Sequence, residues 1–246
     1  MSKSAIPKPD VIKRVILSMG GKGGVGKTCI MTSLAEWFDE NQIPVKLLDL
    51  DIENKARGSL THFFGGRVPK ININTPAGLD AFIDHLSDGI PVILADMGAG
   101  AGQITYEWFD RMYPDVAECG IEFTAIGVVT ADPASVESVL SWAAHLQNRV
   151  TYLIIENCMS QYSDFTYWNE SEQARHFKEV FPPAVIRTDY RLPEHPRGIH
   201  RGLTAARSQA MRAAQYVSLM FRRQTPQPTI KNEPRMEIDH DHGLSL

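Results

Sequence analysis

The chain has 246 residues, 43% of them hydrophobic and 22% charged, which is ordinary usage for a globular protein with one sizeable core. A net charge of −4 and a pI of about 6.1 exclude nucleic-acid or membrane binding through overall charge. No apolar run approaches the ~20 residues of a membrane span, and the first ten residues lack the apolar region of a signal peptide, so we expect a soluble protein. Its three separated cysteines form no Cys-x-x-Cys pair; they predict neither disulfides nor a zinc site and favour a cytoplasmic location.

Apolar runs alternate with helical stretches along residues 13–223, which form one predicted domain. The expected strands are 14–19, 45–48, 92–95, 123–130, 151–156 and 184–187. The expected helices are 27–41, 76–87, 103–111, 133–148, 170–181 and 203–223. The strands lack period-2 alternation, so we predict an α/β fold, doubly wound, with a mainly parallel sheet and helices on both faces. Residues 1–12 are expected to be a flexible N-terminus and 224–246 a disordered tail.

A phosphate-binding loop follows the first expected strand. Gly21-x4-Gly26-Lys27-Thr28 matches the P-loop pattern, and the expected strand and helix flank it as that loop requires. Glycines let backbone N–H groups surround phosphates, and the helix N-terminus adds a positive dipole end. Lys27 is expected to reach the β- and γ-phosphates and the Thr28 hydroxyl to coordinate Mg²⁺. The predicted nucleotide-binding residues here are Gly21, Gly23, Gly24, Val25, Gly26, Lys27, Thr28 and Cys29.

Three aspartates end the second and third expected strands. Asp49 and Asp51 follow one apolar run, and Asp96 ends the run 91–95 as in a Walker B element. Carboxylates past the carboxyl ends of parallel strands face the crevice where nucleotides bind. Each aspartate alone is more typical of strand-end capping or a turn, but together with the loop they favour a nucleotide site.

The segment Lys22–Thr28 resembles the deviant Walker A loop of the ParA/MinD family of dimerising P-loop ATPases. The resemblance implies that Lys22 reaches the partner's phosphates across an ATP-sandwiched homodimer while Lys27 acts within its own chain. It further implies that Asp51 activates water, that Thr28, Asp49 and Asp96 form the Mg²⁺ site, and that the cofactors are ATP and Mg²⁺. The family often continues Pro-Gln-Gly-Asn where this chain has Ile-Glu-Asn-Lys at 52–55, which leaves the switch contacts and the hydrolysis rate open.

The resemblance continues, more diffusely, to about residue 220. Residues 96–100 resemble the Asp-x-Gly-Ala-Gly of MinD-like members, and 128–135 resemble the family's Thr-x-Pro-Glu-Pro-x-Ser segment. Asn157 ends an expected strand where the family binds adenine, and its amide can both donate to and accept from a purine edge. A turn-forming asparagine is the alternative. The aromatic stretch 162–168 is interpreted either as a docking surface or as core packing.

Ten arginines and lysines lie between 175 and 223, against three acidic residues. In the family this region can bind DNA non-specifically; solvated helix faces are the alternative reading. Residues 211–223 have the pattern of an amphipathic membrane helix, but a last helix packed on the sheet needs the same pattern and is favoured.

The sequence as a whole predicts an ATP-dependent dimerising switch of the bacterial cytoplasm that slowly hydrolyses MgATP to control positioning, partition or assembly of a macromolecular cargo. The alternatives are a small-molecule kinase or ligase of the dethiobiotin-synthetase type, which would not need Lys22, and a metal-insertion chaperone of the same superfamily, which would need paired cysteines. The cargo, the protein partner and the role of the tail are not encoded in any motif we recognise.

Overall fold

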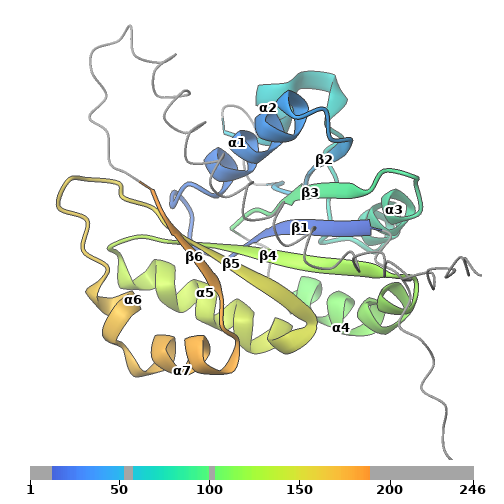
Figure 1. Cartoon of the computed structure of the whole chain (residues 1–246). Coiled ribbons are helices and arrows are strands. Elements are labelled where there is room, and N and C mark those ends of the chain that lie inside the picture. Colours follow the sequence, from blue (N-terminus) through green and yellow to red (C-terminus); the bar gives the residue numbers. More distant parts are fainter. Residues whose placement is uncertain (1–12, 53–57, 100–102, 189–246) are drawn as a thin grey trace, which may run out of the picture.

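Six strands form one sheet in which every neighbouring pair is parallel. The computed structural model describes residues 13–52, 58–99 and 103–188. The strands are β1 (Lys13–Met19), β2 (Val45–Asp49), β3 (Val92–Asp96), β4 (Ile121–Val129), β5 (Val150–Glu156) and β6 (Ala184–Arg187). Their order across the sheet is β2-β3-β1-β4-β5-β6 (Figure 1). The order reverses direction beside β1, which creates the crevice where ligands of open α/β sheets bind.

Helices cover both faces of the sheet (Figure 1). On one face lie α1 (Lys27–Glu40) and α2 (Leu60–Phe64). Short 3₁₀ turns follow α2 at Gly65–Arg67 and α5 at Gln147–Arg149. The other face packs against α3 (Pro76–Leu86), α4 (Gln103–Glu118), α5 (Pro133–Leu146), α6 (Thr166–Glu170) and α7 (Glu172–Val180). The predicted doubly wound α/β fold is therefore confirmed.

Residues of β1 alternate between two separate cores. Val15 and Leu17 belong to the core beneath α3–α7, whereas Ile16 belongs to the core beneath α1 and α2. All seven residues of β1 are buried, because helices cover both sheet faces and leave neither to water. This central, fully buried strand gives the loop that follows it a rigid base.

Three helices differ from the sequence-based expectation. Helix α4 continues through Pro114 to Glu118, because Met112 and Val116 extend its buried face past the proline. The helix expected at 170–181 is α7, which begins after Ser171, whose extended backbone and side-chain oxygen cap it, and the separate α6 was not predicted. The short α2 was not predicted at all. The expected helix 203–223 and both predicted terminal segments lie outside the described residues.

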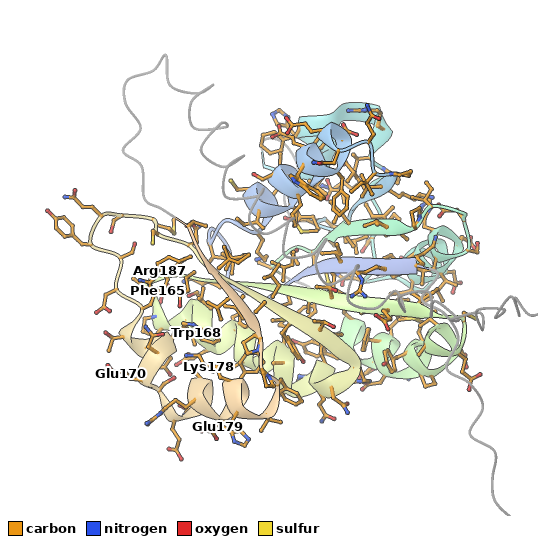
Figure 2. The ribbon with its side chains drawn as sticks, viewed as in Figure 1. Phe165, Trp168, Glu170, Lys178, Glu179 and Arg187 are labelled. Atoms are coloured by element: carbon orange, nitrogen blue, oxygen red, sulfur yellow. The ribbon has the colours of Figure 1, made fainter. Side chains whose placement is uncertain are left out.

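The aromatic stretch of residues 162–168 is divided between core and surface. Phe165 and Trp168 are buried, which confirms core packing for these two, while Tyr162 is 83% exposed. Arg187 covers the ring of Phe165 and Lys178 that of Trp168, with cation-to-centroid distances of 4.9 Å and 4.2 Å (Figure 2). Within the part of the chain that the structure describes, no helix has the length and hydropathy to cross a membrane.

Candidate nucleotide-binding site

The phosphate loop connects β1 to α1 and depends on two glycines with left-handed backbone. Gly24 has φ +75° and Gly26 has φ +101°, values that residues with a side chain rarely adopt. A Cβ on Gly26 would also lie 2.6 Å from Nδ2 of Asn157, so the position excludes any side chain on two grounds. Lys27 begins α1, is almost buried, and its Nζ donates to the carbonyl oxygen of Lys22 at 2.8 Å. The side chain of Lys27 is therefore enclosed by the loop that precedes it.

A cleft of about 450 Å³ lies over this loop and the N-terminus of α1. Its size is that of a small-molecule site, and its helix N-terminus suits an anion. Two predicted loop residues do not line it: Gly21 packs near the carbonyl of Ala99, and Val25 is buried in the core. The lining residues are Gly23, Gly24, Gly26, Lys27, Thr28, Cys29, Asp51, Gly58, Met97 and Ala99.

Asp96 is fully buried at the end of β3, directly before Met97, which lines the cleft; Asp96 itself is not among the lining residues. Its Oδ1 accepts a hydrogen bond from Ser18 Oγ at 2.9 Å, and its Oδ2 is buried without a hydrogen-bond partner among the described residues. Burial raises the pKa of Asp96 to about 6; the nearby hydroxyls of Thr28 and Ser18 oppose this, and the charges of Asp49 and Asp51 add to it. An unpartnered buried carboxylate oxygen close to a threonine hydroxyl fits the requirements of a Mg²⁺ ion.

Asp49 is paired in register with Asp96 and is also fully buried. Its oxygens already have protein partners: Oδ1 accepts from the N–H of Asp51 at 3.1 Å, and Oδ2 from the N–H of Thr61 at 3.2 Å. Lys70 Nζ lies 3.6 Å from the same Oδ2. These contacts hold the first turn of α2 and the backbone of Asp51, while the predicted place of Asp49 in a Mg²⁺ shell stays a prediction.

Asp51 lines the cleft and lies against the loop that follows β3. A Cβ on Gly98 would be 2.5 Å from Asp51 Oδ1, so only glycine lets the two segments approach this closely. The segments that follow β2 and β3 are therefore in direct contact. This proximity places the Asp51 carboxylate beside the phosphate loop, where the predicted activation of water would have to occur.

Lys22 extends away from its own cleft. Its Nζ forms an ion pair with Asp132 Oδ2 at 3.1 Å, and both side chains are nearly half exposed. Its backbone N–H donates to Ser138 Oγ at 3.0 Å, which fastens the beginning of the loop to α5. The pKa of Asp132 is lowered by the N–H of Ala134 and by Lys22. The two lysines of the loop thus have different positions, one inside the cleft and one on its outer rim.

Asn157 lies next to the phosphate loop, and its side chain binds protein atoms. Nδ2 donates to the carbonyl oxygen of Val25 at 2.8 Å, and Oδ1 accepts from Thr188 Oγ1 at 3.2 Å. An asparagine amide has one further donor and acceptor site, so its predicted contact with adenine stays a prediction.

The structure shows four further residues that the sequence reasoning did not assign to the site: Ser18, Asp132, Ser138 and Thr188. Ser18 had a visible signal, since it is a lone polar residue in an otherwise apolar stretch just before the loop. Asp132, Ser138 and Thr188 reach the site only through tertiary contacts, and no spacing rule in the sequence connects them to it.

Only part of the proposed nucleic-acid surface lies within the described residues. Arg175 is exposed, but Lys178 donates to the carbonyl of Trp168 and Arg187 is paired with Glu156. The predicted residues beyond 188 lie outside the described part, so DNA binding through 175–223 stays a prediction. Among the described residues there is no group of three or more His, Cys, Asp or Glu side chains arranged to hold a metal ion.

Comparisons of the sequence with known proteins match short parts of the chain. Residues 11–75 match the ParA family model described as a NUBPL iron-transfer P-loop NTPase. A 41-residue segment is 46% identical to a cytosolic Fe-S cluster assembly factor Nubp2 homolog of Aedes aegypti; it spans 17% of this chain and only 16% of that protein.

Solved structures with a similar arrangement include the MinD cell division protein of Aquifex aeolicus, at 16% identity over 83% of this chain and 96% of that one, with a TM-score of 0.47. A putative plasmid partition protein of Borrelia burgdorferi bound to AMPPNP is similar at 12% identity over 86% and 99% of the two chains, with a TM-score of 0.49. At these scores the likenesses carry no argument of their own. The family match over 11–75 covers the strand, the phosphate loop and the first aspartates that build the site, and over these residues the chain is similar to P-loop NTPases of the ParA family.

Proposed function

We propose that the chain binds MgATP and hydrolyses it slowly, and that ATP favours a dimer which hydrolysis releases. The observation that carries this proposal is the different placement of the two loop lysines. Lys27 is enclosed by its own loop, whereas the ammonium group of Lys22 lies on the outer rim beside Asp132. A cation on the rim is placed to approach the phosphates of a second copy, as an arginine finger does.

The ion pair that holds Lys22 on the rim is weak enough to be exchanged. Lys22 and Asp132 are 43% and 48% exposed, and pairs this exposed contribute about 0–1 kcal/mol. An ATP phosphate from a partner chain offers Lys22 more negative charge in a less solvated setting. We therefore expect Lys22 to leave Asp132 when two loaded chains meet.

Within one chain, each side chain of the site has a distinct task. Backbone N–H groups of the loop and Lys27 bind the phosphates, and Thr28 with the free oxygen of Asp96 would hold Mg²⁺. When bound, Mg²⁺ neutralises developing phosphate charge. Asp51 orients the attacking water from its position against Gly98. Such a dimer switch would control the positioning, partition or assembly of a cargo.

Iron–sulfur assembly is a second candidate, favoured by the similarity to an iron-transfer P-loop NTPase family and to the Nubp2 homolog. The described cysteines are separated: Cys29 lines the nucleotide cleft, Cys119 lies between α4 and β4, and Cys158 follows β5. Purification without oxygen, followed by iron and sulfide analysis, tests this candidate. Stoichiometric iron with cluster absorbance would favour it, and their absence would leave the nucleotide switch.

The switch is tested by comparing Lys22→Ala with the wild type for ATP affinity, phosphate release and molar mass by light scattering. We expect Lys22→Ala to bind ATP within about threefold of the wild type but to lose the ATP-dependent dimer and at least tenfold in phosphate release. Arg175→Ala removes an exposed cation elsewhere and serves as the matched control, and Lys27→Ala should lose nucleotide binding altogether. If Lys22→Ala dimerises and hydrolyses like the wild type, the proposed role of Lys22 is wrong.

A further inference from the structure

Two consecutive hydrogen bonds connect the edge of the sheet to the phosphate loop. Thr188, the residue after β6, donates from Oγ1 to Asn157 Oδ1 at 3.2 Å, and Asn157 Nδ2 donates to the carbonyl oxygen of Val25 at 2.8 Å. Val25 lies within the loop, directly before Gly26 and Lys27. The side chain of Asn157 therefore bridges the two segments.

The amide can take only one orientation in this bridge. With the opposite assignment, Oδ1 would face the carbonyl oxygen of Val25 and two acceptors would oppose each other. Nδ2 also lies where a Cβ of Gly26 would be only 2.6 Å away, so the amide is packed directly on the loop backbone. Contact on two successive loop residues restricts the position of the loop as a whole.

Thr188 is held firmly enough to orient the amide. It is 3% exposed, and its Oγ1 accepts from the N–H of Cys158 at 3.0 Å. The Thr188 hydroxyl has two acceptors within reach, Asn157 Oδ1 at 3.2 Å and the carbonyl oxygen of Glu156 at 3.3 Å, and that carbonyl already accepts from the N–H of Thr188 at 2.9 Å. The ion pair between Arg187 and Glu156 adds a further link between the ends of β5 and β6.

We propose that Asn157 is a positioning residue for the phosphate loop, and that Thr188 at the end of β6 orients it. Asn157 fixes the carbonyl of Val25, and so keeps the following loop N–H groups directed into the cleft. Its effect on nucleotide affinity then passes through the phosphates and does not require the base. The edge strand β6 becomes a support of the phosphate site, although it lies three strands from β1.

This inference rests on the nucleotide-binding part of the proposed function, and a ligand without a base tests it. Affinities for ATP and for inorganic triphosphate are measured by calorimetry on wild type, Asn157→Ala and Thr188→Val. Asn157→Ala loses the hydrogen bond to the loop and Thr188→Val the one that orients Asn157, so each variant should weaken both ligands by about five- to tenfold. Thr188→Ser keeps the hydroxyl and should retain wild-type affinity for both.

A residue that only recognised adenine would behave differently. Asn157→Ala would then weaken ATP but leave inorganic triphosphate unchanged, and Thr188→Val would change neither; that pattern overturns the proposal. Asn169→Ala, at an exposed asparagine on α6, is the matched control and should bind both ligands like the wild type. Circular dichroism melting of each variant separates loss of fold from loss of positioning: Thr188→Val exchanges the hydroxyl for a methyl group, and Thr188→Ser keeps the hydroxyl but lacks the methyl group. Failure of the wild type to bind ATP would contradict the proposed function itself.

Discussion

The carboxyl group of Asp96 is buried at the end of β3, and its free oxygen Oδ2 has no hydrogen-bond partner among the described residues. Its pKa, raised by burial to about 6, lies above the usual value near 4 for an aspartate in an unfolded chain. Between these two values the native state binds more protons than the unfolded state. The contribution of Asp96 to the free energy of unfolding therefore falls as the pH rises from about 4 to about 6, and it is constant above this range.

Asp96→Asn should stabilise the metal-free protein at pH 7.5, because a neutral amide removes the cost of burying a charge. A shift of about two pKa units corresponds to about 3 kcal/mol, so we expect an increase of about 1–3 kcal/mol in the free energy of unfolding, measured with urea. The difference should vanish near pH 4, where Asp96 is protonated. Asp80→Asn, at an exposed aspartate of α3, is the control and should have no such effect. A variant that is destabilised equally at both pH values would show that charge burial is not the dominant effect.

At the scale of elements, Asp49 connects β2 to α2. Helix α2 has only five residues, too few to be stable alone, and it exists because tertiary contacts hold it. The carboxylate of Asp49 accepts from the backbone of Thr61 in its first turn and from that of Asp51. It thereby couples the helix to the aspartate that lines the cleft.

Asp49→Ala should lower the free energy of unfolding by about 2–4 kcal/mol, because two backbone donors and the ammonium of Lys70 lose their acceptor at a buried position. Chemical denaturation gives the value, and proteolysis near α2 should become faster than in the wild type. Asp39→Ala, near the exposed end of α1, provides the comparison. Wild-type stability of Asp49→Ala would argue that Asp49 is not structural and would favour its predicted role as a metal ligand.

The strands, the major helices and the phosphate loop were predictable from sequence because each depends on local pattern. The apolar run of residues 14–17 and the spacing of Gly21, Gly26 and Lys27 carry enough information on their own. The short α2 was not predictable, since a hydrogen bond from a residue distant in sequence holds it, whereas the start of α7 is set by a local cap at Ser171 that the prediction missed. The same holds within the site: the three aspartates were predictable as strand ends, but no pattern revealed which carboxylate has protein partners and which has a free oxygen.

At the scale of the whole molecule, the carboxyl ends of three parallel strands lie side by side along one edge of the sheet. The phosphate loop follows β1, Asp96 ends β3, and Asp49 ends β2, in the spatial order β2-β3-β1. Further along the same edge, Asp132 precedes α5 and Asn157 follows β5. This edge therefore carries the phosphate loop, Asp51 and the rim lysine Lys22. Such an arrangement leaves a face on which a second copy can meet the nucleotide.

The most direct test of the proposed switch is the molar mass of Asp51→Ala, measured by light scattering after gel filtration with MgATP and with MgADP. Removing the carboxylate that orients water should leave ATP bound but unhydrolysed, since Lys27 and the loop are unchanged. We predict a stable dimer with MgATP, a monomer with MgADP, and phosphate release at least tenfold slower than in the wild type. A monomer with MgATP, at a concentration where calorimetry shows that ATP is bound, would contradict the dimerising switch.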